Sequence, residues 1–574
     1  MPLVIVKHQG KKYEVDLDPT SLGEVLKFQL YSLTGVEPDR QKILVKGGQL
    51  KDDTDLSKLG AKPGQVFMMM GTASADGGGF SRPKEAIKFV EDMTEAEAAQ
   101  QVGATPAGLQ NLGNTCYLNS TLQTLRAVPE LHDELAKYVA GPSSRPVGST
   151  LGDLSMFGLG GLGASSDLTA SLRDLYKQMG ETQDGFPPLA FLNALRTIYP
   201  QFNEKSKSGH GYAQQDAEEA WSQILSQIRE KLKVKTEGPS GTTEESFVDK
   251  YLGGKFSTIT ECDEQAAKDA GEESVSGEDS FLKLNCHISG TTNHLKDGIL
   301  AALEEQMEKT SPVLGRDAVY TKKSRISRLP KYLTVHFVRF FWKKEAQKKA
   351  KIMRKVTFPQ ELDVVEFCTD HLRSLLIPVR DKVREVRKDE EDVERAKKRQ
   401  KRIHDKAAAD AAAGITDSVS ESKKADEKKD EKKKPADGDT PMEDVVYKTD
   451  AEVDAERAAA ILEAKKELHA LISPELGADT NQSGLYELRG VVTHQGASAD
   501  SGHYTSYVKK LGPLDPKTGK RGEEDGNWWW FNDDKVSEVD AEKILTLSGG
   551  GESHSALILL YKALPLPSAE GETA

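Results

Sequence analysis

The pattern of apolar residues along the first 70 positions predicts a small domain in which strands surround one helix. Short apolar runs predict four strands, and apolar residues at intervals of three and four predict the helix. These five elements cover residues 3–6, 13–17, 22–33, 43–45 and 66–70. Gly10 fits the turn between the first two strands, and Thr20 or Ser21 would cap the helix. The order of elements predicts a small α+β roll over residues 1–72.

A second, larger α+β domain is predicted over residues 105–563. Apolar residues recur at helical spacing after Cys116, and again in residues 168–179, 188–198 and 221–232. Runs rich in β-branched and aromatic residues predict strands at residues 247–260, 281–287, 329–340, 485–496, 501–508 and 556–561. Between the two domains, residues 73–104 begin with a Gly-rich run and are interpreted as a linker.

A charged segment, residues 381–450, is predicted to be an insertion within the larger domain. Lys, Glu, Asp and Ala dominate it, and opposite charges spaced by four residues favour a helix. From residue 413 the composition is typical of disorder, and a second predicted helix ends before Pro474. The basic run 397–402 is interpreted as a solvated helix face, with a nuclear import patch as the alternative. Residues 564–574 are predicted to be a disordered tail.

Composition excludes several classes of protein. The chain has 574 residues and a formal net charge of −13, which argues against nucleic acid as a main partner. Its four cysteines include no C-x-x-C pair, so we expect neither a disulfide framework nor a zinc ribbon. No signal peptide and no long apolar segment is visible, which argues against a membrane partner. We therefore expect a cytosolic or nuclear protein, monomeric when free, without a metal or other cofactor.

One cysteine stands at a predicted helix start. Gly113 turns the chain toward Cys116, and Asn114 or Thr115 is placed to cap the helix. A thiol at a helix N-terminus lies among free backbone N–H groups at the positive end of the helix dipole, and both favour the thiolate. Asn111, five residues upstream, is placed to direct its amide group at the same point. Taken alone, Cys116 would instead be interpreted as a buried structural thiol.

Four runs in the larger domain resemble the sequence boxes of the ubiquitin-specific proteases, a family of papain-like deubiquitinases. Residues 108–120 match G-L-x-N-x-G-N-T-C-Y-x-N-S at every fixed position. Residues 214–219 resemble the box Q-Q-D-A-x-E, residues 486–504 resemble the histidine box, and residues 528–533 resemble W-x-x-F-[DN]-D. The resemblance implies the fingers, palm and thumb of that catalytic domain for residues 105–563.

The resemblance also implies roles for individual residues. Cys116 would be the nucleophile, His503 the base, and Asn532 the group that orients His503 by accepting from its Nδ1–H. Asn111 and the backbone N–H of Cys116 would stabilise the oxyanion, and Asp533 would help or replace Asn532. Four residues would contact the C-terminal tail of ubiquitin: Gln215, Asp216, Glu219 and Tyr504. Asp216 and Glu219 are expected on one face of a helix, and a solvated acidic helix turn is the alternative.

Other polar residues near these boxes are expected to be structural. His494 matches the first histidine of the histidine box, which is not the catalytic one, and His336 lies on a predicted core strand. Many members of the family carry two zinc-binding C-x-x-C pairs in the fingers. Cys262 and Cys286 stand alone there, so we predict fingers without zinc.

Residues 1–72 resemble ubiquitin almost without gaps, apart from the tail and its two glycines. The resemblance implies an integral ubiquitin-like domain with a β-grasp fold that is not conjugated. Leu44, His8 and Met69 or Met70 lie where ubiquitin carries its apolar recognition patch. We favour a docking face for a ubiquitin receptor; the alternative is ordinary fold residues with one exposed methionine.

The whole layout resembles the proteasome-associated branch of this family. The resemblance implies thiol-dependent hydrolysis of the bond after the C-terminal Gly-Gly of ubiquitin, releasing ubiquitin from proteasome-bound conjugates. The partners would be ubiquitin conjugates and the 26S regulatory particle, reached through the ubiquitin-like domain in cytoplasm and nucleus. Loops near Lys343 and at residues 497–500 would cover the tail channel. Two other functions stay open: a catalytically silent ubiquitin-binding scaffold, and a peptidase for another ubiquitin-like modifier.

Overall fold

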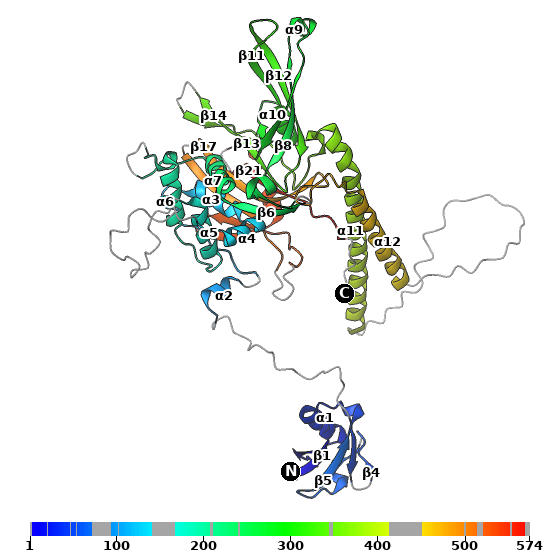
Figure 1. The fold of residues 1–574 in the computed structure, drawn as a ribbon. Coiled ribbons are helices and arrows are strands. Elements are labelled where there is room, and N and C mark those ends of the chain that lie inside the picture. The colour runs from blue at the N-terminus through cyan, green and yellow to red at the C-terminus, as the bar shows by residue number, and fades with distance from the viewer. Residues whose placement is uncertain are drawn as a thin grey trace, which may run out of the picture. The chain divides into compact units, whose positions relative to one another are not determined.

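The computed structural model describes most of the chain (Figure 1). Its description leaves out residues 1–2, 20, 46–47, 53, 72–92, 101–102, 141–166, 207–210, 239–240, 344–347, 413–449, 499–500, 514–520, 552–553 and 569–574. The chain divides into two compact units, Met1–Met93 and Thr94–Ala574, which are taken separately below. Both combine helices with strands, which confirms the predicted α+β class. None of the described helices is both long and apolar enough to cross a membrane.

The first unit is a five-stranded sheet with a helix packed on one face (Figure 1). Its elements are β1 (Leu3–His8), β2 (Lys11–Asp16), α1 (Gly23–Thr34), η1 (Pro38–Arg40), β3 (Lys42–Val45), β4 (Gly48–Gln49), η2 (Leu56–Leu59) and β5 (Val66–Met70). The strand order is β2-β1-β5-β3-β4, with β1 and β5 parallel. Gln9 and Gly10 have φ angles of 45° and 79°, the left-handed pair that suits a two-residue hairpin turn. Leu26 and Leu30 of α1 are buried against the sheet.

The predicted cap of α1 is wrong. Leu22 occupies the N-cap position and makes no side-chain capping bond. The Ser21 hydroxyl donates to the carbonyl of Asp18 instead, and Thr20 lies outside the described residues. The first N–H groups of the helix donate to carbonyl oxygens of the loop at residues 52–54, so a side-chain cap is not needed.

The prediction that His8 and Met69 belong to an exposed docking face is also wrong. His8 is 6% exposed and its Nδ1 lies 3.2 Å from the carbonyl oxygen of Met69, which is itself 2% exposed. Successive side chains of a strand point to opposite faces, so Met69 faces the core while Met68 and Met70 face outward. Leu44 pairs with Met68 across β3 and β5, and Leu44, Met68 and Met70 are 43%, 53% and 50% exposed. We call these three residues the sheet patch.

The centre of the second unit is a ten-stranded sheet. Seven strands follow the order β10-β13-β21-β17-β18-β19-β20, and three more join at its border. These strands are β10 (Leu284–His287), β13 (Tyr332–Val338), β14 (Phe340–Lys343), β15 (Lys348–Lys351), β16 (Glu361–Asp363), β17 (Leu485–Ser498), β18 (Ser501–Lys509), β19 (Trp528–Asn532), β20 (Lys535–Val539) and β21 (Ser555–Ala563). The last strand of the chain, β21, therefore lies between β13 and β17, inside the sheet.

The helices of this unit include α2 (Glu95–Ala99), α3 (Cys116–Leu125), α4 (Pro129–Lys137), α5 (Leu168–Met179), α6 (Leu189–Ile198), η6 (Pro200–Asn203), α7 (Ala217–Lys231), α8 (Phe247–Tyr251), α10 (Leu295–Ala302), η8 (Val365–Phe367) and α13 (Ala541–Leu545) (Figure 1). Side chains of α3 to α8 and of η6 form the main core with the sheet, those of α10, η8 and α13 belong to a second core, and α2 has no buried residue. Every residue of α3 is buried, because this helix contacts β18 on one side and α7 on the other. The predicted helices 168–179 and 188–198 are confirmed as α5 and α6.

A separate four-stranded sheet extends from the main body (Figure 1). Its order is β11-β12-β8-β9, and a two-stranded sheet, β6-β7, lies elsewhere in the unit. The elements are β6 (Lys233–Gly238), β7 (Gly241–Ser246), β8 (Gly254–Cys262), α9 (Gln265–Asp269), β9 (Val275–Phe281), β11 (Glu304–Thr310) and β12 (Asp317–Arg328). The strand predicted over residues 247–260 is wrong at its start, because residues 247–251 form α8 and Ser246 caps it.

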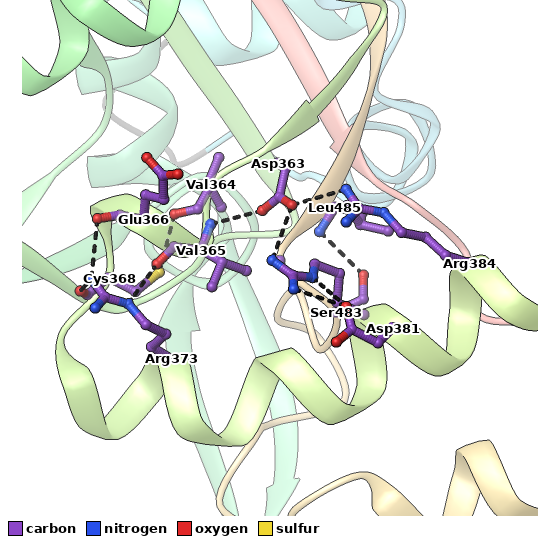
Figure 2. Close-up of polar contacts among 12 residues, drawn as sticks. Asp363, Val364, Val365, Glu366, Cys368, Arg373, Asp381, Arg384, Ser483 and Leu485 are labelled. Atoms are coloured by element: carbon purple, nitrogen blue, oxygen red, sulfur yellow. Dashed lines mark hydrogen bonds and ion pairs between the residues drawn. The ribbon is translucent and has the colours of Figure 1, made fainter.

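Two helices, α11 (Asp370–Ala412) and α12 (Asp450–Leu471), pack against each other and form an arm. Figure 2 shows how the root of α11 is fixed to the sheet. The carboxylate of Asp363, at the end of β16, lies 3.3 Å from Arg380 and 2.9 Å from Arg384. Val379 and Val383 of the same root are fully buried. Both ion pairs and apolar contacts therefore attach the arm to the ten-stranded sheet.

Three predicted boundaries differ from the structure. Residue 381 lies inside α11, and Val383 and Val386 beyond it are still fully buried, so the change in composition there marks no boundary of an element. Helix α2 lies within the predicted linker 73–104 yet belongs to the second unit. Leu564 and Leu566 pack beside the root of the arm, so residues 564–568 of the predicted disordered tail are ordered, and residues 569–574 lie outside the described residues. Apolar side chains in this Leu-Pro-Leu-Pro run explain that order.

Candidate active site

Cys116 is the first residue of α3 and is 2% exposed. The turn before it uses positive φ angles at Gly113 (94°) and Asn114 (56°). Thr115 holds the N-cap position, but its hydroxyl accepts from the backbone N–H of Leu112 rather than from the helix. The predicted capping bond is therefore wrong, and the N–H groups of Leu118 and Asn119 donate to the carbonyl oxygen of Thr115.

Two donors from distant segments reach the sulfur of Cys116. The Nε2 of Gln214 lies 3.3 Å from Sγ, and the backbone N–H of Tyr504 lies 3.5 Å from it. His503 also forms a side-chain hydrogen bond with Cys116, and this bond is the main cause that raises the pKa of His503 to about 9. Together these contacts place two N–H donors and the imidazole of His503 around the sulfur.

His503 is held by Asn532 from the neighbouring strand. The Nε2 of His503 lies 2.6 Å from Oδ1 of Asn532, where β18 and β19 are adjacent. The prediction that Asn532 accepts from Nδ1–H is therefore wrong in its choice of nitrogen. With Nε2–H donating to Asn532, the Nδ1 of the ring is the nitrogen left to exchange a proton with the thiol.

Asp533 does not orient His503 but connects the two halves of the site. Its Oδ1 accepts from Asn119 Nδ2 at 2.8 Å, and its Oδ2 accepts from Asn111 Nδ2 at 3.0 Å. Its carbonyl oxygen also accepts from the backbone N–H of Leu109. The backbone of Asp533 has a φ of 53°, a left-handed conformation that Asp tolerates better than most residues. Asp533 thus ties the cysteine segment to β19, and its charge acts on His503 only from a distance.

The amide of Asn111 faces away from the predicted oxyanion position in this structure. Its Nδ2 donates to Asp533, and its Oδ1 accepts from the backbone N–H groups of Gly113 and Thr115. Asn111 therefore shapes the turn before Cys116. The amide that faces the sulfur is that of Gln214, which the sequence analysis missed although it is the first residue of the Q-Q-D-A-x-E box.

The residues predicted to meet the ubiquitin tail have different local roles here. Gln215 donates to the carbonyl of Gln201. Asp216 caps α7 by accepting from the N–H of Glu218, so it precedes the helix and the predicted shared helix face with Glu219 is wrong. Tyr504 contributes its backbone N–H to the sulfur, as described above.

His494 is fully buried beside the site. Its ring packs edge to face against Phe340 and Tyr504, with centroids 5.2 Å and 4.7 Å apart. Burial lowers the pKa of His494 to about 3, so the ring is neutral and acts in packing. A Cβ at Gly502 would lie 2.6 Å from Nε2 of His494, which leaves room only for glycine next to the predicted base.

The two cysteines of the predicted fingers lie apart, on β8 and β10. Burial raises the pKa of Cys286 to about 12, which is unfavourable for a metal-binding thiolate. Cys262 packs with Tyr320 in a small apolar cluster. In the part of the chain that the structure describes, no three His, Cys, Asp or Glu side chains gather as a metal ion would require.

Comparison with known proteins gives matches over both units. The family described as "Ubiquitin carboxyl-terminal hydrolase" matches residues 107–561, and the "Ubiquitin family" matches residues 4–74. Ubiquitin carboxyl-terminal hydrolase 6 of Schizosaccharomyces pombe is 42% identical, with 98% of each chain covered. Ubiquitin carboxyl-terminal hydrolase 6 of Arabidopsis thaliana is 38% identical over 98% of this chain and 99% of the relative. Ubiquitin carboxyl-terminal hydrolase 14 of Caenorhabditis elegans is 31% identical over 98% of this chain and 94% of the relative.

Proposed function

Because the chain belongs to the ubiquitin carboxyl-terminal hydrolase family, and is a cysteine-type deubiquitinase with an N-terminal ubiquitin-like domain, we propose that Cys116, His503 and Asn532 form its catalytic triad. The observation that carries this proposal is the line from the thiol through His503 to Oδ1 of Asn532. Such a line of nucleophile, base and orienting amide is the arrangement that thiol catalysis needs.

In the proposed reaction, His503 takes the proton of the Cys116 thiol. The thiolate attacks the carbonyl carbon of the last glycine of ubiquitin, where that glycine is joined to a lysine amine. The C–N bond then breaks, His503 gives its proton to the departing amine, and a thioester with Cys116 remains. Water attacks the thioester after losing a proton to His503, which releases the ubiquitin carboxylate and restores the thiol.

The developing oxyanion needs hydrogen-bond donors near the sulfur. The backbone N–H of Cys116 at the start of α3 and the amide of Gln214 are the nearest candidates. Asn111 would add a third donor only if its amide turned away from Asp533. This proposal therefore gives Gln214 the part that the sequence analysis assigned to Asn111.

Hydrolysis of a fluorogenic amide at the C-terminus of ubiquitin tests the triad. Cys116→Ala should abolish turnover and leave ubiquitin binding intact, and retained turnover would overturn the assignment. A panel of probes built on ubiquitin and on other ubiquitin-like modifiers then identifies the substrate, because only the preferred modifier should label Cys116. Binding without turnover by the wild-type chain would favour a scaffold instead.

We also propose that the sheet patch docks the enzyme on the 26S regulatory particle, so that ubiquitin is released from proteasome-bound conjugates. The support is an exposed apolar surface on a ubiquitin-like domain. Activity should rise when proteasome stripped of its own deubiquitinase is added. Leu44→Glu should remove this rise, whereas Phe28→Glu, at an equally exposed position on α1, should not. Unchanged activity with proteasome would contradict the docking.

We further propose that the β14–β15 hairpin and the turn between β17 and β18 regulate access to the site. The two are joined at their roots, because Ala350 pairs with Ser498 and the ammonium of Lys351 donates to the carbonyl of His494 at 2.6 Å. Hydrogen exchange at residues 348–351 should change when proteasome binds, and equal activity of the free and bound enzyme would reject the regulation.

A cytoplasmic and nuclear location is proposed as well. The basic run 397–402 lies on α11, and its side chains outside residue 400 are exposed. Neutral substitutions in this run should reduce nuclear import of a fluorescent fusion without changing hydrolysis. An unchanged nuclear fraction would leave the run as a solvated helix face.

A further inference from the structure

A cavity of about 360 Å³ lies in the second unit, next to the strands that carry the proposed triad. Its walls come from the chain segment after α2, the end of α3, the end of α5, and the ends of β18 and β19. Phe531, the residue before Asn532, lines the cavity. Neither Cys116 nor His503 does, so this cavity is separate from the catalytic cleft.

Basic side chains dominate the polar part of this wall, but most of them have partners. Arg489 and Lys509 form ion pairs with Glu524, and Lys510 forms them with Asp525 and with a further glutamate, so the charge of these three cations is compensated. Among the described residues, the remaining two, Arg126 and Arg521, form no ion pair.

Arg126 is half-buried, and among the described residues its guanidinium donates to the neutral amide oxygen of Gln123, at 3.3 Å. Arg521 donates to the backbone carbonyl of Gly512. Both charges act on one neighbour, His132, whose pKa falls to about 4 through burial and through the charges of Arg126 and Arg521. Among the described residues no carboxylate pairs with either guanidinium group, so the two create a shared positive region.

The rest of the wall is apolar, with Met179, Val508 and the ring of Trp529 among its residues. Small-molecule sites in proteins have volumes of about 300–1,000 Å³, mostly apolar walls and a few charged groups that fix orientation. Guanidinium groups bind carboxylate and phosphate with two parallel hydrogen bonds, and this attraction grows when the site is shielded from water. The cavity lies in this range of volumes and combines apolar side chains with two arginines that form no ion pair among the described residues.

We propose that this cavity is a binding site for a small organic anion, in which an aromatic or aliphatic body contacts Met179, Val508 and Trp529 and an anionic group pairs with Arg126 and Arg521. The body fills the apolar part of the wall, and the anion pairs with the two guanidinium groups, for which the described part of the chain supplies no carboxylate partner. Both carboxylate and phosphate satisfy this chemistry.

Calorimetric titration of the full chain with four probes tests the site. 1-Naphthyl phosphate and 1-naphthoate carry an aromatic body and an anion, 1-naphthol carries the body alone, and inorganic phosphate carries the charge alone. At least one of the two aromatic anions should bind at least about tenfold more tightly than either partial probe. The stronger of the two identifies the preferred anionic group.

Two substitutions test whether the aromatic anions bind in this cavity. Arg126→Gln and Arg521→Gln should each weaken binding of the aromatic anion by about tenfold, because each removes a charge-assisted contact. Arg521 is exposed, so its substitution does not threaten folding. Arg395→Gln, at an exposed arginine on α11, is the matched control and should leave binding unchanged.

The outcomes separate clearly. Equal binding of 1-naphthol would overturn the anion site, as would unchanged binding in both cavity variants or no binding of the aromatic anions at millimolar concentration. Because the readout is direct binding, it does not depend on hydrolytic activity or on the proposed triad.

Discussion

The Nε2 of His503 and the Oδ1 of Asn532 lie 2.6 Å apart, on the neighbouring strands β18 and β19. An amide oxygen in this position accepts a proton from the ring without bringing a negative charge. It fixes the direction of the imidazole and leaves the thiol as the main stabiliser of the protonated ring.

Asn532→Ala should therefore slow hydrolysis without abolishing it. We expect kcat to fall by about 10- to 100-fold, less than the 10²–10⁴-fold typical of general base catalysis itself. The measurement is steady-state hydrolysis of the fluorogenic ubiquitin amide beside Cys116→Ala. A loss as large as that of Cys116→Ala would show that Asn532 does more than orient His503.

The protonation of His503 should depend on the thiol. Its pKa is raised to about 9, first by the hydrogen bond to Cys116 and then by Asn532. Because this value lies above the ordinary 6.5, the proton stabilises the fold below about pH 6.5, and that contribution fades as the pH rises to 9. NMR titration of the ring should give a lower pKa in Cys116→Ala; an unchanged value would exclude a contribution of the thiol.

Asp533→Ala should lower stability as well as activity. The change removes the carboxylate that accepts from Asn119 and Asn111. Asn119 keeps the carbonyl oxygens of Leu109 and Gln110 as acceptors, so the expected cost is about 1 kcal/mol, the net value of an ordinary hydrogen bond. Urea unfolding of the full chain measures this loss. Asp534→Ala, at the exposed neighbour, is the control and should stay within about 0.5 kcal/mol of wild type.

Substitutions of Gln214 and Gln215 should differ in their effect on kcat, although the two residues are adjacent. Gln214 faces the sulfur of Cys116, so Gln214→Leu should lower kcat by about tenfold or more. Gln215 donates to Gln201, so Gln215→Leu should change kcat much less. Similar losses of kcat in both variants would contradict the role given to Gln214.

The attachment of the helical arm to the sheet at the root of α11 should depend on Asp363 (Figure 2). Asp363→Asn keeps the bond to the backbone N–H of Val365 but removes the charge that pairs with Arg380 and Arg384. These partly exposed pairs should contribute about 1 kcal/mol or less, so α11 should exchange its amide hydrogens faster near its root. Asp381→Asn, which affects only an exposed pair with Arg380, should have little effect on exchange.

Linear motifs and periodicity predicted much of this architecture. The cysteine box, the histidine strand and the strand with Asn532 could be predicted because each is a continuous run whose local structure follows from its own residues. Periodicity alone also predicted α5 within its observed bounds.

The errors concern contacts between distant residues and the direction of single side chains. The amide of Asn111 is turned by a carboxylate 422 residues away, which no local pattern reveals. Met69 was assigned to the surface although strand alternation places it in the core. Leu564 and Leu566 are ordered by the root of an arm whose packing the composition did not indicate.

The position of β21 has a consequence for biosynthesis. This last strand, Ser555–Ala563, completes the sheet between β13 and β17, and Asp533 reaches back to Asn119 across 414 positions. A ribosome adds about 5–20 residues per second, so Cys116 emerges well before the strands that complete its surroundings. In a nascent or prematurely terminated chain, Cys116 should therefore be catalytically inactive. The enzyme should gain its activity only after synthesis is nearly finished.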